Sequence, residues 1–516
     1  MPVVAVLTRL ISTLFAIHPL LTRSIALENI QNLPASLLDC LDTTGSSVFY
    51  PSSPGYDALR RTQNADYSPR PAAIVQPTSS KEVAAILRCV SAEEGRVKLS
   101  PKGGGHSYAA YGFSGQVVID SGKMKDITFN DARREVTVQF GQTLGPLATA
   151  MGRKGYALPH GTCPGVGVAG HSLGGGYGYT SRKWGWLLDH IVAMEFVDVH
   201  GNIKHLSSNA TGTDAELWWG LRGAGANNFG VVTSFTYAME LAPAATVNFN
   251  LPFAAKSDCS QALLSLQDLG GPLADQHNGL PIEWGADLVF TGRVPGEGSS
   301  CYILGQYLGT EAEYSAVHDR LLEDLQRRGV KPLANGTRSR EFKDWTEALT
   351  DIMGSLNEPS VPLSYYAKSL LDDGAPRYTV HDADSIMDAV QAARTNGAKS
   401  RVAFNVEGPR SRTNQKPPMG DTSFVHRDSL FIVQIYSSYG HATVRTEVVS
   451  KLDNAMKTVR AGNPRSNWHA YQNYVDPYLE DFGQAYYGPN LERLKSLKSL
   501  ADPNAIFDYP QSLNHA

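Results

Sequence analysis

The chain has 516 residues, of which 42% are hydrophobic and 19% charged, with 48 Gly and 29 Pro. This composition is that of a globular protein and excludes a disordered or fibrous chain. The 46 basic and 50 acidic side chains give a formal charge of −4. Because no block of like charges is present, nucleic acid is not expected as a partner. At roughly 150 residues per domain, the length allows two or three domains.

The first 26 residues are typical of a secretory signal peptide. An apolar run from Leu10 to Leu21 ends in the small-x-small pattern Ser24-Ile25-Ala26. The run is too short for a membrane anchor and contains His18-Pro19, and no later stretch is long enough to span a membrane. We therefore expect a secreted, extracellular protein with no membrane contact. Asn209 and Asn335, each in an Asn-x-Thr sequon, are candidate glycosylation sites.

Strand and helix patterns are mixed in the first half of the chain. A capping box from Ser79 to Glu82 predicts the start of a helix with apolar residues at helical spacing. Thr213 with Glu216 is interpreted as the cap of a further helix. Strands are predicted at 72–75, 97–99, 135–140, 191–199 and 203–206, the last two forming a hairpin. This mixture without a strict repeat favours α+β layers.

Longer helices are predicted beyond residue 243, where glycine becomes sparser. Val317, Leu321, Leu322 and Leu325 mark one amphipathic helix, and residues 430–436 have the pattern of a strand. We place a first domain at 27–243 and a second at 244–455. The tail, residues 456–516, is expected to return to the first domain.

Five cysteines remain to be explained: Cys40, Cys89, Cys163, Cys259 and Cys301. In an oxidising compartment an odd number leaves one thiol without a disulfide partner. Cys163 lies in a glycine-rich loop, so we interpret it as the unpaired one. Cys40 with Cys89 and Cys259 with Cys301 are then the natural pairs, although connectivity cannot be deduced from sequence.

Two glycine-rich loops are the strongest candidates for a ligand site. Eight glycines fall between Gly161 and Gly178, and three more precede His106. Ordered glycine costs conformational entropy, so this density indicates backbone that approaches a ligand closely or adopts positive φ. Successive N–H groups in such loops can bind a pyrophosphate. We therefore expect a large flat or phosphate-bearing ligand. His106 and Cys163, one in each loop, are nucleophiles able to bond to it covalently.

Two other motifs support alternative functions. Residues Gly165 to Gly170 match the dinucleotide fingerprint, but the strand and helix that it needs do not flank them. Residues Gly170 to Gly174 match a nucleophile elbow around Ser172, yet the following glycines would form a poor helix. A serine hydrolase using Ser172 therefore stays an alternative, as does a noncatalytic carbohydrate-binding protein. The scattered His and Cys lack metal-ligand spacing, so no metal is expected.

Five segments together identify a family. They are Lys102-Gly103-Gly104-Gly105-His106-Ser107-Tyr108, residues His160 to Gly167, Leu221-Arg222-Gly223-Ala224-Gly225, Phe229-Gly230-Val231-Val232-Thr233, and residues Asp502 to Phe507. With them the sequence resembles the berberine-bridge-enzyme-like FAD-linked oxidases of the vanillyl-alcohol-oxidase-type fold, and is similar in particular to fungal oligosaccharide oxidases. The likeness covers residues 65–240 and, more loosely, 360–516. It implies a two-subdomain FAD-binding (PCMH-type) domain and a substrate domain with an antiparallel sheet covered by helices.

The resemblance implies a bicovalent FAD, attached through His106 to the 8α methyl and through Cys163 to C6 of the isoalloxazine. The free cysteine would thereby have a function. The other cofactor-binding residues that it implies are Lys102, Gly103, Gly104, Gly105, Ser107, Gly167, Val168, Gly170, His171, Gly178, Gly230, Val232 and Asn473. A tethered cofactor is retained without deep burial, so the space above its ring can admit a bulky substrate.

The resemblance also implies a catalytic base, Tyr474, in the segment Tyr471-Gln472-Asn473-Tyr474. It would take a proton while hydride passes to the flavin, which O2 reoxidises with release of H2O2. A free phenol titrates near ~10, so the neighbours must favour phenolate or the proton and hydride must leave together. A dehydrogenase with another acceptor stays an alternative. Tyr108, Tyr177, Gln434 and Tyr471 are implied as substrate-binding residues.

The sequence departs from its sugar-oxidising relatives on one predicted strand. Where they carry Trp, Gln and Asp at alternating positions, this chain has Arg401, Ala403 and Asn405. Asn405, a candidate catalytic residue, can hydrogen-bond Tyr474 but cannot accept its proton. The departure weakens the oligosaccharide interpretation and leaves a bulky alcohol of secondary metabolism as a second substrate class. Without an oligomer signal, a monomer is the default expectation.

Overall fold

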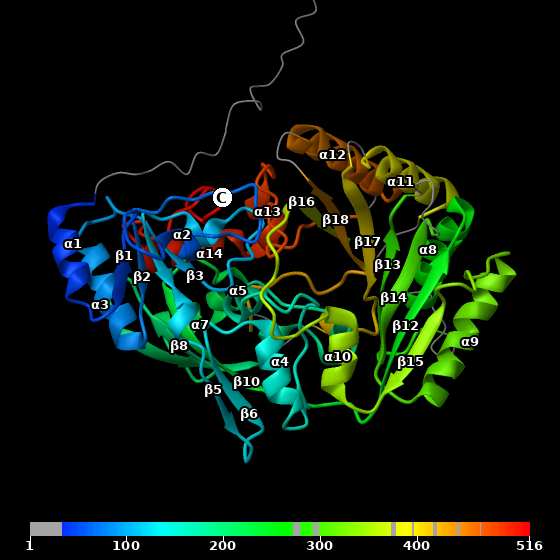
Figure 1. Ribbon diagram of the computed structural model, residues 1–516, viewed down its shortest axis with the longest axis horizontal. Coiled ribbons are helices and arrows are strands. Elements are labelled where there is room, and N and C mark those ends of the chain that lie inside the picture. The colour runs from blue at the N-terminus through cyan, green and yellow to red at the C-terminus, as the bar shows by residue number, and fades with distance from the viewer. Residues whose placement is uncertain are drawn as a thin grey trace, which may run out of the picture.

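The computed structural model describes residues 33–271, 279–292, 299–372, 378–394, 397–415, 421–440, 444–464 and 466–516. Residues 1–26, the predicted signal peptide, lie outside this range. Figure 1 shows two lobes. One contains the first strands of the chain together with its C-terminal segment, and the other is built on a large sheet.

The first lobe begins with a four-stranded sheet in the order β1-β2-β4-β3. Its strands are β1 (Ser47–Phe49), β2 (Ala73–Gln76), β3 (Leu99–Lys102) and β4 (Val117–Asp120), and β4 pairs in parallel with both β2 and β3. The helices α1 (Ala35–Asp42) and α3 (Ser80–Ser91) lie beside it. Ser79 accepts a hydrogen bond from the Glu82 backbone N–H, which confirms the predicted capping residue.

A five-stranded antiparallel sheet completes the first lobe, in the order β5-β6-β10-β8-β9. It contains β5 (Ile127–Asn130), β6 (Glu135–Gln139), β8 (Ile191–Val197), β9 (Ile203–Ser207) and β10 (Val231–Ala238), so the predicted hairpin is confirmed as the β8–β9 pair. The helices α4 (Leu144–Gly152), α5 (Val168–Leu173) and α7 (Thr213–Ala224) belong to the same lobe, in which α5 contacts β10 and α7 contacts β9. Thr213 was expected to cap α7, but Gly212 occupies the N-cap position, with a φ of 57° that favours glycine.

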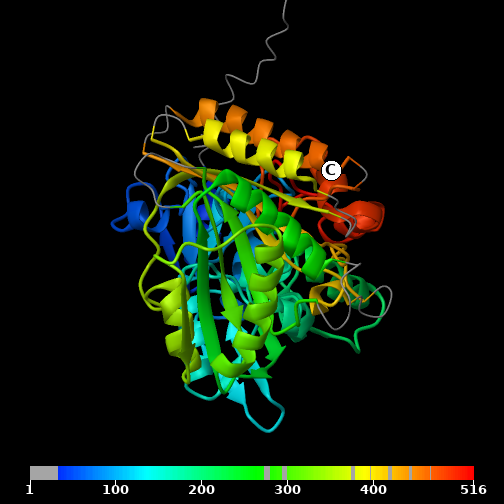
Figure 2. The same ribbon diagram turned by 90° about the vertical axis from the view of Figure 1, so that its right-hand side faces the viewer.

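The second lobe is a seven-stranded antiparallel sheet in the order β15-β12-β14-β13-β17-β18-β16. Its strands are β12 (Thr246–Phe253), β13 (Trp284–Phe290), β14 (Cys301–Tyr307), β15 (Arg338–Phe342), β16 (Ser364–Leu371), β17 (Lys399–Val406) and β18 (Phe431–Tyr439). The helices α8 (Lys256–Gly270), α9 (Glu311–Arg327), α11 (Val380–Ala392) and α12 (Arg445–Gly462) cover the face turned away from the first lobe (Figures 1 and 2). The predicted antiparallel sheet with its helical cover is therefore confirmed.

Each lobe has its own main hydrophobic core. The first core draws on residues between 33 and 239 and between 470 and 513, and also includes Leu371, Phe424 and Ile432. The second core lies between 247 and 459. The C-terminal segment, with α13 (Phe482–Tyr487) and α14 (Leu491–Ala501), thus returns to the first lobe. The Leu99 N–H donates to the Ile506 carbonyl at 2.9 Å, and the buried Lys498 ammonium donates to the carbonyls of Asn228 and Phe507, each at 2.7 Å. The boundaries proposed at 243 and 455 stay predictions.

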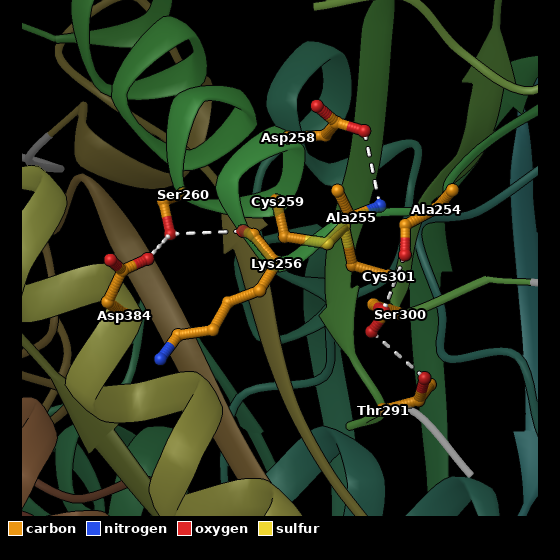
Figure 3. Close-up of a disulfide and its surroundings, with 10 residues drawn as sticks. All are labelled: Ala254, Ala255, Lys256, Asp258, Cys259, Ser260, Thr291, Ser300, Cys301 and Asp384. Atoms are coloured by element: carbon orange, nitrogen blue, oxygen red, sulfur yellow. Dashed lines mark hydrogen bonds between the residues drawn. A yellow bond between two sulfur atoms is a disulfide. The ribbon is translucent and has the colours of Figure 1, made fainter. Parts of the chain in front are cut away.

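Both expected disulfides are present. Cys40 of α1 is joined to Cys89 of α3, and Cys259 of α8 is joined to Cys301 at the start of β14. Figure 3 shows the second bridge, which holds the outer helix α8 against the sheet. Cys163 is free, as predicted.

Two kinds of feature are absent from the described residues. None of the helices in these ranges is both long enough and apolar enough to cross a membrane. The same ranges hold no group of three or more His, Cys, Asp or Glu side chains able to bind a metal ion.

Candidate active site

A cavity of about 600 Å³ lies between the glycine-rich loops of the first lobe and strands β13, β14, β17 and β18 of the seven-stranded sheet. Most of the residues expected at the site line it: Lys102, Gly103, Gly104, Gly105, His106, Ser107, Tyr108, Cys163, Gly167, Gly170, His171, Tyr177, Gly230, Val232, Gln434, Tyr471, Asn473 and Tyr474. The fold therefore gathers into one cavity residues that are more than 300 positions apart in the chain.

The two glycine-rich loops touch each other on the first-lobe side of the cavity. A Cβ on Gly104 would lie 2.4 Å from the Gly167 backbone nitrogen, and one on Gly165 would lie 2.9 Å from His106 Nε2. Only glycine allows this approach, because real Cβ atoms do not come that close to backbone. The loops that carry His106 and Cys163 are thus in direct contact.

The surrounding protein shifts the pKa of both candidate attachment residues, His106 and Cys163. Burial lowers the pKa of His106 to about 4, so the imidazole is neutral at neutral pH and keeps a nucleophilic nitrogen. Desolvation by the surrounding protein raises the pKa of the Cys163 thiol, and the Arg401 guanidinium acts in the opposite direction. The Cys163 side chain is nevertheless accessible from the cavity.

Tyr474 lies at the centre of an aromatic cluster. Its hydroxyl is 3.0 Å from that of Tyr177, and its ring stacks on Tyr108 with centroids 5.6 Å apart. Burial raises the pKa of Tyr474 above its ordinary value, while the hydrogen bond with Tyr177 acts to lower it. The Tyr474 phenol is therefore protonated at neutral pH and has to lose this proton before it can act as a base, which the hydrogen bond with Tyr177 favours.

The segment around Tyr474 is fastened to the glycine-rich loop. The Gly176 N–H donates to the Tyr471 hydroxyl at 2.7 Å, and the Asn473 amide donates to the same hydroxyl and to the His171 carbonyl, each at 3.0 Å. Tyr471 is fully buried, so its main contribution is to position this segment rather than to offer a broad substrate surface.

The sheet forms the opposite wall of the cavity. Arg401 and Ala403 of β17 both line it, because alternate residues of a strand point to the same face of the sheet. Gln434 of β18 lies opposite Ala403. The Gln434 amide donates to the Tyr108 hydroxyl at 3.0 Å, which links the sheet to the first-lobe loop.

Asn405 differs from its expected place. It does not line the cavity, and its amide donates to Asp287 Oδ1 at 2.7 Å instead of bonding Tyr474. The reason is the strand order, since β13 lies beside β17 and pairs Asp287 with Asn405. Asn405 is thus a partner of a cavity residue and not itself in contact with the reaction space.

Asp287 is a cavity residue that the sequence analysis did not predict. Its carboxylate lines the cavity, accepts hydrogen bonds from Asn405 and Tyr179, and lies close enough to raise the pKa of Tyr177 and Tyr474. Burial raises the pKa of Asp287 itself. The available signal was a lone carboxylate inside the otherwise apolar segment from Trp284 to Phe290.

Two expected cofactor residues, Val168 and Gly178, do not line the cavity either. The Val168 N–H donates to the Gln142 carbonyl, and the Gly178 N–H donates to the Ser181 hydroxyl. Their backbone donors are therefore already used within the protein. Both residues therefore contribute hydrogen bonds within the protein and do not form part of the cavity wall.

Ser172, the nucleophile of the hydrolase alternative, is fully buried in the short helix α5. Its hydroxyl shares a hydrogen bond of 2.7 Å with Tyr237. A nucleophilic serine needs a base within hydrogen-bond reach and access to substrate, and Ser172 has neither among the described residues. The geometry thus disfavours the hydrolase.

The cavity suits FAD by several independent features. Its volume is in the range of cofactor sites. Its wall includes the Tyr111 hydroxyl and the side-chain Oδ1 of Asn227, which are buried and without a hydrogen-bond partner among the described residues. Such atoms are costly to bury alone and are suited to meet the polar groups of a ligand. Two contacting glycine loops and two nucleophiles complete a site for a flat, phosphate-bearing molecule.

Comparison with known proteins agrees with this geometry. The family described as "FAD binding domain" matches residues 71–207, and the family described as "Berberine and berberine like" matches residues 470–514. The carbohydrate oxidase of Microdochium nivale is 31% identical over 493 residues, covering 92% of this chain and 94% of that protein. The xylooligosaccharide oxidase of Thermothelomyces thermophilus is 32% identical over 471 residues, covering 86% and 88%.

The same fold occurs in the glucooligosaccharide oxidase of Acremonium strictum, described with a 6-S-cysteinyl, 8α-N1-histidyl FAD. That structure superposes with a TM-score of 0.82 at 25% identity and covers 93% of this chain and 99% of its own. The fold and the site define an FAD-dependent oxidoreductase. The chain belongs to the berberine-bridge-enzyme-like FAD-linked oxidases.

Proposed function

We propose that this protein is a secreted oligosaccharide oxidase whose FAD is attached through both His106 and Cys163. The observation that carries the proposal is the coincidence of three groups in one cavity: a neutral imidazole, a free thiol and the hydrogen-bonded phenol of Tyr474. The relatives named as carbohydrate and xylooligosaccharide oxidases support the substrate class.

The chain's own residues would divide the work of the reaction. FAD, when bound, accepts hydride from an alcohol and passes the electrons to O2, which yields H2O2. Tyr474, as its phenolate, removes the proton of the substrate hydroxyl, and Tyr177 donates the hydrogen bond that stabilises this phenolate before the transfer. Gln434, held by Tyr108, offers amide groups to sugar hydroxyls. The Tyr471 and Asn473 bonds hold this segment in place.

The first test concerns the attachment. The purified protein is expected to be yellow and to keep its flavin after acid precipitation. His106→Ala and Cys163→Ala should each leave one covalent bond, and the double variant should release the flavin into the supernatant. If the peptides that contain His106 and Cys163 were both unmodified in protein produced with excess flavin, the proposal would be overturned.

The second test concerns the reaction. Peroxide release should be measured with neutral oligosaccharides and with polycyclic alcohols typical of secondary metabolism. Turnover of the sugars supports the proposal, and turnover of the polycyclic alcohols alone would replace the substrate class. A serine-directed phosphonate should leave Ser172 unlabelled, because this side chain is buried.

Secretion rests on the predicted signal peptide and on the two sequons. Asn209 and Asn335 are both exposed, as glycan attachment requires. We expect the mature chain in the culture medium to begin near Leu27. Its mass should fall on treatment with an N-glycan-removing enzyme, and Asn209→Gln combined with Asn335→Gln should abolish that change.

A further inference from the structure

One cation in the cavity wall, Arg401, has no carboxylate partner in the part of the chain that the structure describes. Two basic side chains, Lys102 and Arg401, line the cavity. Lys102 forms an ion pair with Asp120. Arg401 forms no ion pair with any described residue, although it is exposed to the cavity and contributes to the electrostatics of Cys163 and Asp287. Its N–H donors are therefore available to a ligand.

The position of Arg401 is fixed by stacking. Its guanidinium carbon lies 4.7 Å from the centroid of Tyr436, which is directly opposite on β18. A guanidinium held over an aromatic ring is presented with its rotamer restricted, so less entropy is lost when it binds an anion. Arginine also offers paired donors that match a carboxylate.

An aromatic series connects Arg401 to the reacting end of the cavity. Tyr436 stacks on Tyr365 with centroids 5.4 Å apart, Tyr365 meets Tyr108 edge-on at 5.3 Å, and Tyr108 stacks on Tyr474. All four tyrosines line the cavity. A substrate that lies along this series would have its reacting hydroxyl at Tyr474 and its far part at Arg401.

The carboxylate of Asp287 also lines the cavity, but it forms no ion pair with Arg401. Asp287 pairs with Asn405, four residues along β17 from Arg401, which is about 13 Å of strand. Asp287 is also already bonded by Asn405 and Tyr179. The guanidinium of Arg401 thus keeps its donors for an anion, although it is close enough to Asp287 to interact with it electrostatically.

We propose that Arg401 forms a subsite for a carboxylate of the substrate, so that the preferred substrates are acidic oligosaccharides containing a uronic acid. This inference rests on the proposed oligosaccharide oxidase function and narrows its substrate class. It predicts a preference that a purely structural arginine, stacked on Tyr436, would not produce.

The test uses the flavin-loaded enzyme and two substrates of equal length, cellobiose and cellobiouronic acid, which differ by one CH2OH group replaced by a carboxylate. The wild type should show a higher kcat/KM for the acid. Arg401→Gln should raise KM for the acid about tenfold and leave KM for cellobiose within about twofold, as expected for one lost charge-assisted bond. Added salt should raise KM for the acid alone.

Lys399→Gln is the matched control. Lys399 is an exposed cation on the same strand and the same face, two residues before Arg401, and it does not line the cavity. Its loss should leave both KM values unchanged. Equal effects of Arg401→Gln on both sugars, or equal effects of the two variants, would overturn the subsite.

Calorimetric binding of cellobiouronic acid separates the two proposals. Salt-sensitive binding that is lost in Arg401→Gln, without peroxide release, would support the subsite and overturn the oxidation of these sugars. Oxidation of cellobiose with no preference for the acid and no Arg401-dependent binding would retain the oxidase and overturn the subsite. If the enzyme neither bound cellobiouronic acid nor oxidised either sugar, both proposals would be overturned.

Discussion

The hydroxyl of Tyr177 lies 3.0 Å from that of Tyr474, and the two residues are 297 positions apart in the chain. Tyr177 belongs to the glycine-rich loop, and Tyr474 to the returning C-terminal segment. The pair therefore joins the loop that carries Cys163 to the segment that carries the proposed base.

Removing the Tyr474 hydroxyl is expected to stop proton transfer. Tyr474→Phe should lower kcat/KM by about 10² to 10⁴, the usual contribution of a general base. Tyr177→Phe removes only the supporting hydrogen bond and should cost about three- to tenfold. Peroxide release at equal flavin content measures both. A Tyr474→Phe enzyme as active as the Tyr177→Phe enzyme would contradict the assignment.

Asp287 is expected to set the pH dependence of the reaction. Its negative charge disfavours phenolate and so raises the pKa of Tyr177 and Tyr474. Asp287→Asn removes this charge and lowers the pKa of Tyr474, so the rise of kcat/KM with pH should move to lower pH. Profiles from about pH 5 to about pH 10 would reveal the shift.

Glu283→Gln is the control for that shift. It makes the same change of charge shortly before β13, but Glu283 does not line the cavity and is paired with Lys183. Its profile should match the wild type. A move of the Asp287→Asn profile to higher pH would show that the carboxylate acts in another way.

The contact between the glycine loops should be essential for the cofactor. Gly104→Ala places a methyl group 2.4 Å from the Gly167 nitrogen, which is backbone and cannot move alone. We expect a large loss of covalently bound flavin, measured by absorbance after acid precipitation. Gly440→Ala, where a Cβ would meet nothing within 4 Å, should keep the wild-type content. A wild-type content of covalently bound flavin in Gly104→Ala would mean that the two glycine-rich loops can move apart without loss of the cofactor.

The Cys259–Cys301 bridge is expected to stabilise the second lobe. It closes a loop with a sequence separation of 42, and its loss should lower the free energy of unfolding by about 2–4 kcal/mol. The double variant Cys259→Ala/Cys301→Ala avoids a stray thiol, and denaturant unfolding measures the difference. Because the bridge lies on the outer side, flavin attachment in the first lobe should be unaffected. A change below about 0.5 kcal/mol would count against this role.

Local features of the fold could be predicted because neighbouring residues determine them. The Ser79 cap of α3 and the β8–β9 hairpin depend on contacts within a few positions, and both were predicted. The start of α7 was displaced by one residue, since Gly212 and Thr213 both suit a helix start and only the backbone φ distinguishes them.

The wall formed by the sheet could not be predicted in the same way. The bond between Asp287 and Asn405 spans 118 positions and depends on β13 lying beside β17. Strand order is a property of the whole sheet, which periodicity along a single strand does not encode. The family resemblance predicted the first-lobe loops and Tyr474 as parts of the site. It did not predict the partner of Asn405 or the surroundings of Arg401, which only the structure shows.

The C-terminal return has a consequence for biosynthesis. Tyr474 and Asn473 are made late in translation, and the segment that carries them is attached to the first lobe through α14 and the hydrogen bond between Leu99 and Ile506. A polypeptide terminated before Asn473 would keep every strand of the seven-stranded sheet and all four disulfide-bonded cysteines, yet it would lack the proposed base.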